Sequence, residues 1–239
     1  MVEKITELER LRNNKTIRLR IKDLMKMGDI SIDLKDYGVA INKYSDVLEI
    51  DSSNLRALFN LGVIYARIGV SNKAIKYWKQ CSEINPEFLD VWFNLGLIYF
   101  GLEKFNDAIS CFQEVLKRDS QNAPALYNLG NFYSYIFEYQ IAIEYYEAAL
   151  SVDMFDFEAY YNLAKCYERL GKLNNAIEII KEALDIFSYS EILLDKLGNL
   201  YIELEDFESA FDCYETILIT EPCNEHAEIK IKMLKSLIE

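Results

Sequence analysis

The sequence predicts an all-α protein made of a row of antiparallel helix pairs, an α-α superhelix with a capping helix at each end. Three observations support this prediction. Residues that break helices are scarce, because the 239 residues include only 9 glycines and 3 prolines. Hydrophobic residues make up 51% of the chain, which is enough apolar side chain for a core. The third observation is a pattern that recurs every 34 residues.

The 34-residue pattern begins at Ile21 and continues without insertion or deletion. It defines six units: 21–54, 55–88, 89–122, 123–156, 157–190 and 191–224. Counted within each unit, position 20 is always alanine: Ala40, Ala74, Ala108, Ala142, Ala176 and Ala210. Position 8 is small (Gly28, Gly62, Gly96, Gly130, Ala164, Gly198) and position 24 is large (Tyr44, Trp78, Phe112, Tyr146, Ile180, Tyr214). The recurrence indicates one structural module used six times.

Residues 1–20 precede the first unit and are predicted to be a basic helical segment that caps it. Residues 1–26 hold eight Lys or Arg and four acids, whereas the whole chain carries −13. A capping helix would lean on this acidic body. The alternative is a basic amphipathic helix that contacts an anionic membrane surface or an acidic partner. Such helices favour Trp or Phe, which the segment lacks, so capping is favoured.

Each unit contains two apolar stripes with helical spacing. Positions 4, 7, 8 and 11 form one stripe, and positions 17, 20, 24 and 27 form the other. Short polar turns, such as residues 67–72, separate them. We therefore expect two antiparallel helices in each unit, each about 12–14 residues and ~20 Å long.

The glycines at position 8 carry the most information about packing. A glycine inside a helix costs ~1 kcal/mol relative to alanine, so something in the fold must offset the cost of five of them. Close approach of the two helix backbones in each unit would do so. The alanine at position 20 is expected to face the same contact from the second helix.

Four segments show the pattern most completely: Trp92–Leu116 (WFNLGLIYFGLEKFNDAISCFQEVL), Phe59–Pro86, Tyr127–Leu150 and Tyr161–Leu184. They resemble the tetratricopeptide repeat. The first unit departs from that pattern at Ser31, and proline closes only two units, at Pro86 and Pro222. The resemblance implies a tetratricopeptide superhelix and a role in binding other proteins.

Residues 225–239 continue the helical register after the last unit. Ala227, Ile231, Leu234 and Ile238 form one apolar stripe, whereas the places that were aromatic or tyrosine are now polar. This pattern favours a capping helix with one face on the last unit and the other in water. The alternative, a partner-binding or dimerisation helix, would use the same stripe.

The first helix of each unit is short of charge and carries repeated amides and aromatics. Residues 123–136 contain no charged residue. Positions 5, 6 and 9 give ten candidate residues for a peptide-binding groove: Phe59, Asn60, Phe93, Asn94, Tyr127, Asn128, Asn131, Tyr161, Asn162 and Lys165. A side-chain amide both donates and accepts, so it can pair with the main chain of an extended peptide. The alternative is structural: aromatics at position 5 would pack between helices, and asparagine is common at position 6 of the repeat.

The resemblance also suggests a comparison with the carboxylate clamp that some tetratricopeptide proteins use for peptide C-termini. Asn131, Asn162 and Lys196 match three of its places. Tyr127 and Ile192 occupy places that need cations. We therefore expect no recognition of chaperone tails of that type.

The composition also predicts what the chain lacks. It has one histidine, His226, no nucleotide-binding or metal-binding motif, and five dispersed cysteines without a CxxC pair. We expect no catalytic residue, no metal site and no cofactor, and a charge of −13 argues against nucleic acid as a partner. The first ten residues resemble no targeting signal, and no apolar run is long enough for a membrane span, so a cytoplasmic location is expected.

These observations predict a non-catalytic scaffold or adaptor. Its partner would be a protein or peptide, bound in the concave groove as an extended segment or as a helix. The alternative is a self-assembling structural protein, a homo-oligomer formed through the terminal helices or end faces.

Overall fold

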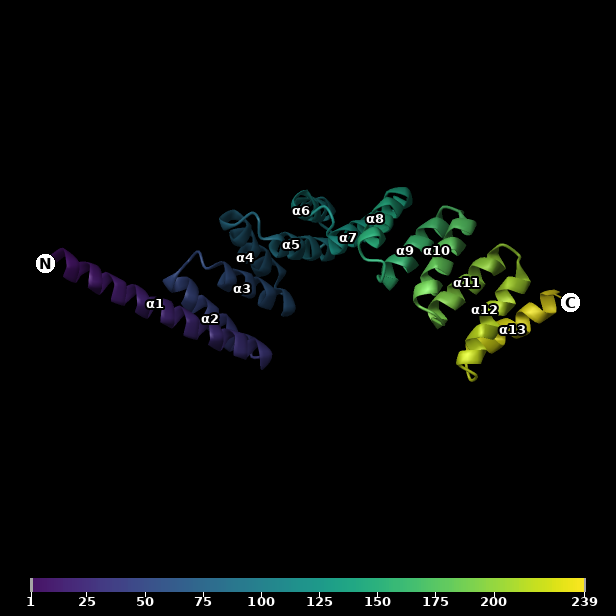
Figure 1. The fold of residues 1–239 in the computed structure, drawn as a ribbon, viewed down its shortest axis with the longest axis horizontal. Coiled ribbons are helices and arrows are strands. Elements are labelled where there is room, and N and C mark those ends of the chain that lie inside the picture. The colour runs from purple at the N-terminus through teal and green to yellow at the C-terminus, as the bar shows by residue number, and fades with distance from the viewer. Residues whose placement is uncertain (1, 239) are drawn as a thin grey trace. The chain divides into compact units, whose positions relative to one another are not determined.

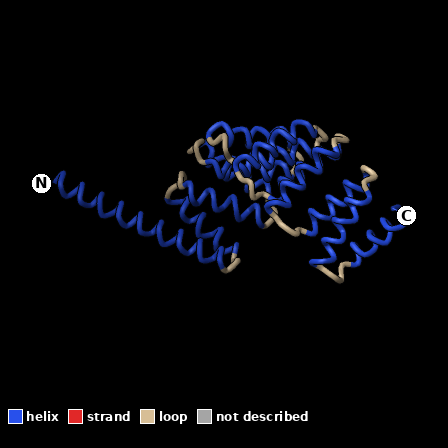
Figure 2. The backbone as a smooth tube through the Cα atoms, turned by 45° about the vertical axis from the view of Figure 1, so that its right-hand side comes forward, coloured by secondary structure: helices blue, strands red, loops and turns tan. Residues whose placement is uncertain are grey.

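The computed structural model describes residues 2–238, with side chains from residue 14 onward. This part of the chain contains thirteen α-helices and no strand (Figure 1), which confirms the all-α prediction. Short loops join successive helices (Figure 2). The helices form two compact units, Met1–Arg118 and Asp119–Glu239, and each is described by itself.

Unit 1 consists of three helix pairs. Its helices are α1 (Val2–Asp33), α2 (Tyr37–Ile50), α3 (Leu55–Arg67), α4 (Ser71–Ile84), α5 (Leu89–Gly101) and α6 (Phe105–Arg118). Within a pair α1 packs on α2, α3 on α4 and α5 on α6, and neighbouring pairs meet where α2 contacts α3 and α4 contacts α5.

Unit 2 contains three more pairs and a final helix. Its helices are α7 (Ala123–Tyr135), α8 (Tyr139–Val152), α9 (Phe157–Arg169), α10 (Leu173–Ile186), α11 (Glu191–Glu203), α12 (Phe207–Thr220) and α13 (Glu225–Ile238). From α3 to α12 the helices alternate between 13 and 14 residues, as the two stripes predicted.

Local sequence sets the helix boundaries. Asn54, Asn122 and Asp156 each accept a hydrogen bond from the main-chain N–H three residues later, which caps α3, α7 and α9. At position 15, between the helices of a pair, the chain adopts a left-handed conformation. Glycine fills this position at Gly69 and Gly171, whereas Phe137 has φ 66°, a conformation that costs a bulky residue ~1–2 kcal/mol.

The glycines at position 8 make room for the large ring at position 24 of the same pair. A Cβ atom at Gly96 would lie 2.7 Å from Phe112, and one at Gly62 would overlap the Trp78 ring. The sequence predicted that the two backbones approach each other, with alanine at position 20 in the same contact. The structure instead shows an aromatic ring of the second helix lying directly over the glycine. In the fifth pair, where position 8 is Ala164, position 24 is the smaller Ile180.

Helix α1 differs from the expected division at residues 20 and 21. It runs without a break from Val2 to Asp33, so the basic segment and the first helix of the 34-residue repeat 21–54 form one helix. Met25 is buried, but residues 14–20 are exposed, because α2 covers only the C-terminal part of α1. The side chains of residues 1–13, with Lys4, Arg10 and Arg12 of the basic segment, lie outside the described residues.

Helix α13 packs on α12 through Ala227 and Leu234, which are fully buried. Ile238, the last member of the predicted stripe, is exposed. A second face of α13 is less polar than the sequence predicted, because Ile229 (64% exposed) and Leu237 (50% exposed) lie on it. Among the described residues, no helix combines the length and the apolar character that a membrane span requires.

Candidate functional site

In unit 1, the predicted groove residues lie on α3 and α5 and make contacts within the fold. The ring centres of Phe59 and Phe88 lie 5.0 Å apart, and those of Phe93 and Phe112 lie 5.7 Å apart. The side-chain amide of Asn94 donates to the main-chain oxygen of Asp90 at 2.6 Å. These three residues therefore have a structural role, although the bond leaves Asn94 a second N–H and its carbonyl oxygen.

In unit 2, the predicted residues lie on α7 and α9, which contact each other and α8. Asn128 resembles Asn94, because its amide donates to the main-chain oxygen of Pro124 at 2.7 Å. The Tyr127 ring lies 5.9 Å from that of Tyr146. Tyr161 lies beneath an ammonium group, since Lys196 Nζ is 6.0 Å from its ring centre.

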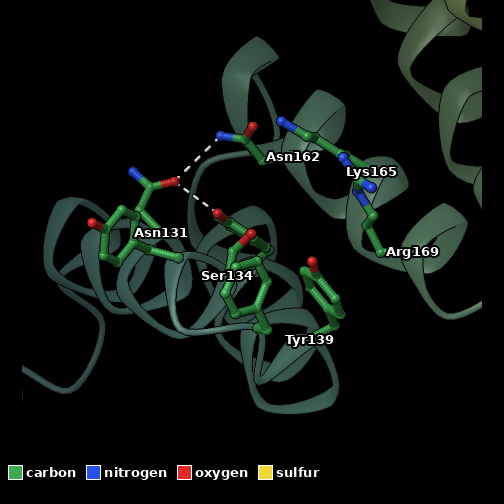
Figure 3. Close-up of a pocket in the computed structure, with 9 residues that line it drawn as sticks. Asn131, Ser134, Tyr139, Asn162, Lys165 and Arg169 are labelled. Atoms are coloured by element: carbon green, nitrogen blue, oxygen red, sulfur yellow. Dashed lines mark hydrogen bonds between the residues drawn. The ribbon is translucent and has the colours of Figure 1, made fainter.

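Asn131 and Asn162 are joined directly. The amide of Asn162 donates to Asn131 Oδ1 at 3.3 Å and to the Tyr127 hydroxyl at 3.2 Å. Asn131 Oδ1 also accepts from the Tyr146 hydroxyl at 2.7 Å. Figure 3 shows the two amides facing each other with a dashed line between them. Burial raises the pKa of Tyr146, so its hydroxyl keeps the proton that it donates.

The bond between Tyr146 and Asn131 recurs in other pairs. Tyr44 donates to Asp29 at 2.7 Å, and Tyr214 donates to Asn199 at 3.1 Å. In each case a tyrosine at position 24 meets Asn or Asp at position 9. The other three pairs have no hydroxyl at position 24 and no Asn or Asp at position 9: Trp78 with Val63, Phe112 with Leu97 and Ile180 with Lys165. Asn131 is therefore partly structural, and the sequence contains the signal that would have shown it.

A pocket of about 510 Å³ opens between α7, α8 and α9, and we call it the α7–α9 pocket. It is lined by Asn131, Ser134, Tyr135, Phe137, Tyr139, Tyr146, Asn162, Lys165 and Arg169. Three of the predicted groove residues, Asn131, Asn162 and Lys165, thus meet at one site. The other six were not among the predicted groove residues, although the sequence had marked Tyr146 as the large residue at position 24. Arg169 had a detectable signal, because it lies one helical turn after Lys165 on the same face of α9.

The lining of the α7–α9 pocket contains two cations and no carboxylate. In Figure 3, Lys165 and Arg169 project from α9, with Ser134 and Tyr139 across the pocket from them. Neither cation belongs to an ion pair among the described residues. Lys196, which matches a clamp position, is instead bound to Glu168 at 2.5 Å. In a chain with a net charge of −13, an uncompensated cationic pocket is a local exception.

The described side chains include no group of three or more His, Cys, Asp or Glu residues placed to hold a metal ion. Cys81, Cys111 and Cys213 are buried, and burial raises the pKa of each thiol to about 12. A thiol with so high a pKa is a poor nucleophile at neutral pH. The single histidine contacts a carboxylate: His226 Nε2 on α13 lies 2.8 Å from Asp195 Oδ1 on α11.

Family profiles match most of the chain. Profiles described as "Tetratricopeptide repeat" match residues 55–88, 89–122, 123–153 and 155–218, and one described as "TPR repeat" matches residues 28–69. No curated protein shows significant sequence similarity to the chain.

Several solved structures resemble this one. A structure of MamA protein is 30% identical, with a TM-score of 0.65, and the match covers 70% of this chain and 91% of that chain. A tetratricopeptide repeat protein from Parabacteroides merdae is 18% identical, with a TM-score of 0.69 and coverage of 92% and 93%. YrrB, described as a TPR protein with an unusual peptide-binding site, is 17% identical, with a TM-score of 0.63 and coverage of 79% and 97%. At these last two identities the likeness shows the fold alone.

Proposed function

The chain belongs to the tetratricopeptide repeat family, whose repeats are protein-interaction scaffolds, and we propose that it binds a partner protein along the first helices of its repeats. The bound element would be an extended segment or a helix of the partner. Repeat folds of this family are typically non-catalytic. An adaptor of this kind works by holding its partner, with no reaction at the bound segment.

The α7–α9 pocket is the observation that carries this proposal. It is open, it lies beside the first helices α7 and α9, and it contains amides, hydroxyls and cations that can pair with a peptide. Asn94 and Asn128 each use one N–H within their own helix. Each keeps one N–H and one carbonyl oxygen, which is the set that pairs with a peptide group.

Binding of a partner to side-chain variants tests this proposal. Partners captured from native lysate would be purified and titrated against the wild-type chain, Asn94→Ala with Asn128→Ala, and a control. The control, Lys76→Ala with Glu178→Ala, changes exposed residues on the second helices α4 and α10. Loss of two peptide-pairing amides should weaken binding about five- to tenfold. Equal affinity of all three proteins, with helical content unchanged, would contradict the proposal.

Self-association is a second candidate, favoured by the apolar faces of the terminal helices. Ile229, Met233 and Leu237 follow one another at four-residue spacing on α13 and are exposed. Met27 and Ile30 are exposed on α1. Such stripes are where a further helix of a repeat stack would pack.

Light scattering across a concentration series distinguishes the two candidates. If the chain self-assembles, the average molar mass measured by light scattering should rise with protein concentration. Met233→Lys should abolish this rise, because it places a charge in the apolar stripe. A constant monomer mass at all concentrations would exclude assembly through these faces.

A further inference from the structure

We propose that the α7–α9 pocket binds the carboxylate of an acidic side chain, Asp or Glu, in the bound segment, and that an aromatic or apolar residue of the same segment packs beside it. This inference rests on the proposed function, because it names the chemistry of the segment. Three independent features of the pocket lead to it: its charge, its hydrogen-bond donors and its apolar edge.

The charge of the pocket selects an anion. Lys165 and Arg169 lie four residues apart on α9 and are both exposed, and no carboxylate lines the pocket to neutralise them. Other cations of unit 2 already have partners: Lys196 is paired with Glu168, and Lys172 Nζ donates to Gln140 at 3.2 Å. Since the body of the chain is strongly acidic, a cationic site here would concentrate the attraction for an acidic segment at one place.

The donors around the pocket suit a carboxylate. Asn162 uses its amide for Asn131 and Tyr127, which fixes the orientation of both amides at the rim of the pocket. Ser134 and Tyr139 place hydroxyl groups across from the two cations (Figure 3). A guanidinium group can hold a carboxylate with two parallel hydrogen bonds, and hydroxyl groups can donate to the remaining lone pairs.

The edge of the pocket supplies an apolar contact. Phe137 is 76% exposed, and its edge-on contact with Tyr139, with 6.2 Å between ring centres, covers part of the ring. Tyr135, 54% exposed, lies near it on the pocket lining. Position 15 has positive φ in all six repeats, and Lys35, Glu103 or Glu205 fills it in three of the others, so the exposed aromatic ring is what distinguishes this repeat. An exposed aromatic beside a cationic pocket therefore favours an acidic residue followed by an aromatic or apolar one.

The test uses the full chain and four small probes in an NMR titration. N-acetyl-Glu-Phe-amide carries both features, N-acetyl-Gln-Phe-amide lacks the charge, and N-acetyl-Glu-Ala-amide lacks the ring. Inorganic phosphate is the fourth probe. Chemical-shift changes of the Asn131 and Asn162 side-chain amides and of the Lys165 and Arg169 backbone amides report binding at the pocket. We expect the Glu-Phe probe to bind about five- to tenfold more tightly than the Gln-Phe probe, because it adds charge-assisted hydrogen bonds.

Two variants that each lose two positive charges test whether the preference for Glu over Gln depends on the pocket cations. Lys165→Ala with Arg169→Ala removes the two pocket cations, whereas Lys232→Ala with Lys235→Ala removes two exposed cations of α13. All four residues are exposed, so both variants should fold. The preference for Glu over Gln should disappear in the first variant and persist in the second. Phe137→Ala should weaken binding of the Glu-Phe probe and leave the Glu-Ala probe unchanged.

Three results would overturn the inference: equal affinity for the Glu-Phe and Gln-Phe probes, a Glu preference that survives loss of both pocket cations, or tighter binding of phosphate than of the Glu-Phe probe. None of them decides the proposed function, which depends on the partner titration with the Asn94 and Asn128 variants. The two proposals can therefore fail separately.

Discussion

Replacing Gly96 with alanine tests whether the glycines at position 8 are kept for the ring that lies on them. The added Cβ would lie 2.7 Å from Cε1, 2.8 Å from Cζ and 3.0 Å from Cδ1 of Phe112. These are shorter than van der Waals distances, and the Phe112 ring is 1% exposed, so it has no open space to move into. The helix pair must separate or the ring must leave its preferred rotamer.

Two effects of opposite sign determine the size of the change. Overpacking of this kind costs ~1–3 kcal/mol. Alanine is the better helix former by ~1 kcal/mol, which offsets part of the cost. We therefore expect Gly96→Ala to lower the free energy of unfolding by ~1 kcal/mol. Gly101 is the matched control, because a Cβ there meets nothing within 4 Å and Gly101→Ala should be neutral or stabilising.

A double-mutant cycle with Phe112→Ile isolates the contact. The double variant recreates the combination of Ala164 and Ile180 that the fifth pair already contains. It should be more stable than the sum of the single variants predicts, by ~1–2 kcal/mol. Urea unfolding followed by circular dichroism and by tyrosine fluorescence measures each corner. If the cycle is additive, or if Gly96→Ala is as stable as Gly101→Ala, the explanation of the glycines is wrong.

Three further predictions concern the core. Ala108→Leu or Ala142→Leu should cost ~1–3 kcal/mol, because both alanines are fully packed; an unchanged melting temperature in both would contradict this. Tyr146→Phe should cost ~1 kcal/mol by removing the bond to Asn131, and Asn131→Leu added to it should recover part of the loss, as in the Phe112 and Leu97 pair; equal stability of wild type and Tyr146→Phe would show that the bond contributes nothing. Burial raises the thiol pKa of Cys81, Cys111 and Cys213 to about 12, so above about pH 9 the folded chain retains protons that the unfolded chain loses. Stability should therefore fall as pH rises from about 9 toward 12, and urea midpoints that stay level from about pH 8 to about pH 10.5 would contradict the prediction.

The repeating part of the fold could be predicted from the sequence because the same two apolar stripes recur in all six 34-residue repeats. The α7–α9 pocket could be predicted only in part. Asn131, Asn162 and Lys165 stood out because they occupy positions where amides or polar residues recur. Ser134 occupies a position that differs from repeat to repeat, and Tyr139 belongs to the apolar stripe at position 17, so neither stands out as a recurring polar residue.

Two other features required the three-dimensional structure. The continuity of α1 through residue 20 follows from the absence of any Gly or Pro between Met1 and Met27, but the 34-residue pattern placed a boundary there. The second apolar stripe of α13 was missed because Ile229 and Leu237 are interspersed with lysines. Only the packing on α12 shows which stripe is covered.

The match between the small residue at position 8 and the ring at position 24 has a consequence for how such chains can lengthen or shorten. Both partners of the match belong to the same 34-residue block, so duplication or deletion of a whole block carries the fit with it. A duplication or deletion that ends inside a helix pair would set a ring against a side chain with no room for it. Growth in whole blocks is therefore the route by which this architecture tolerates recombination.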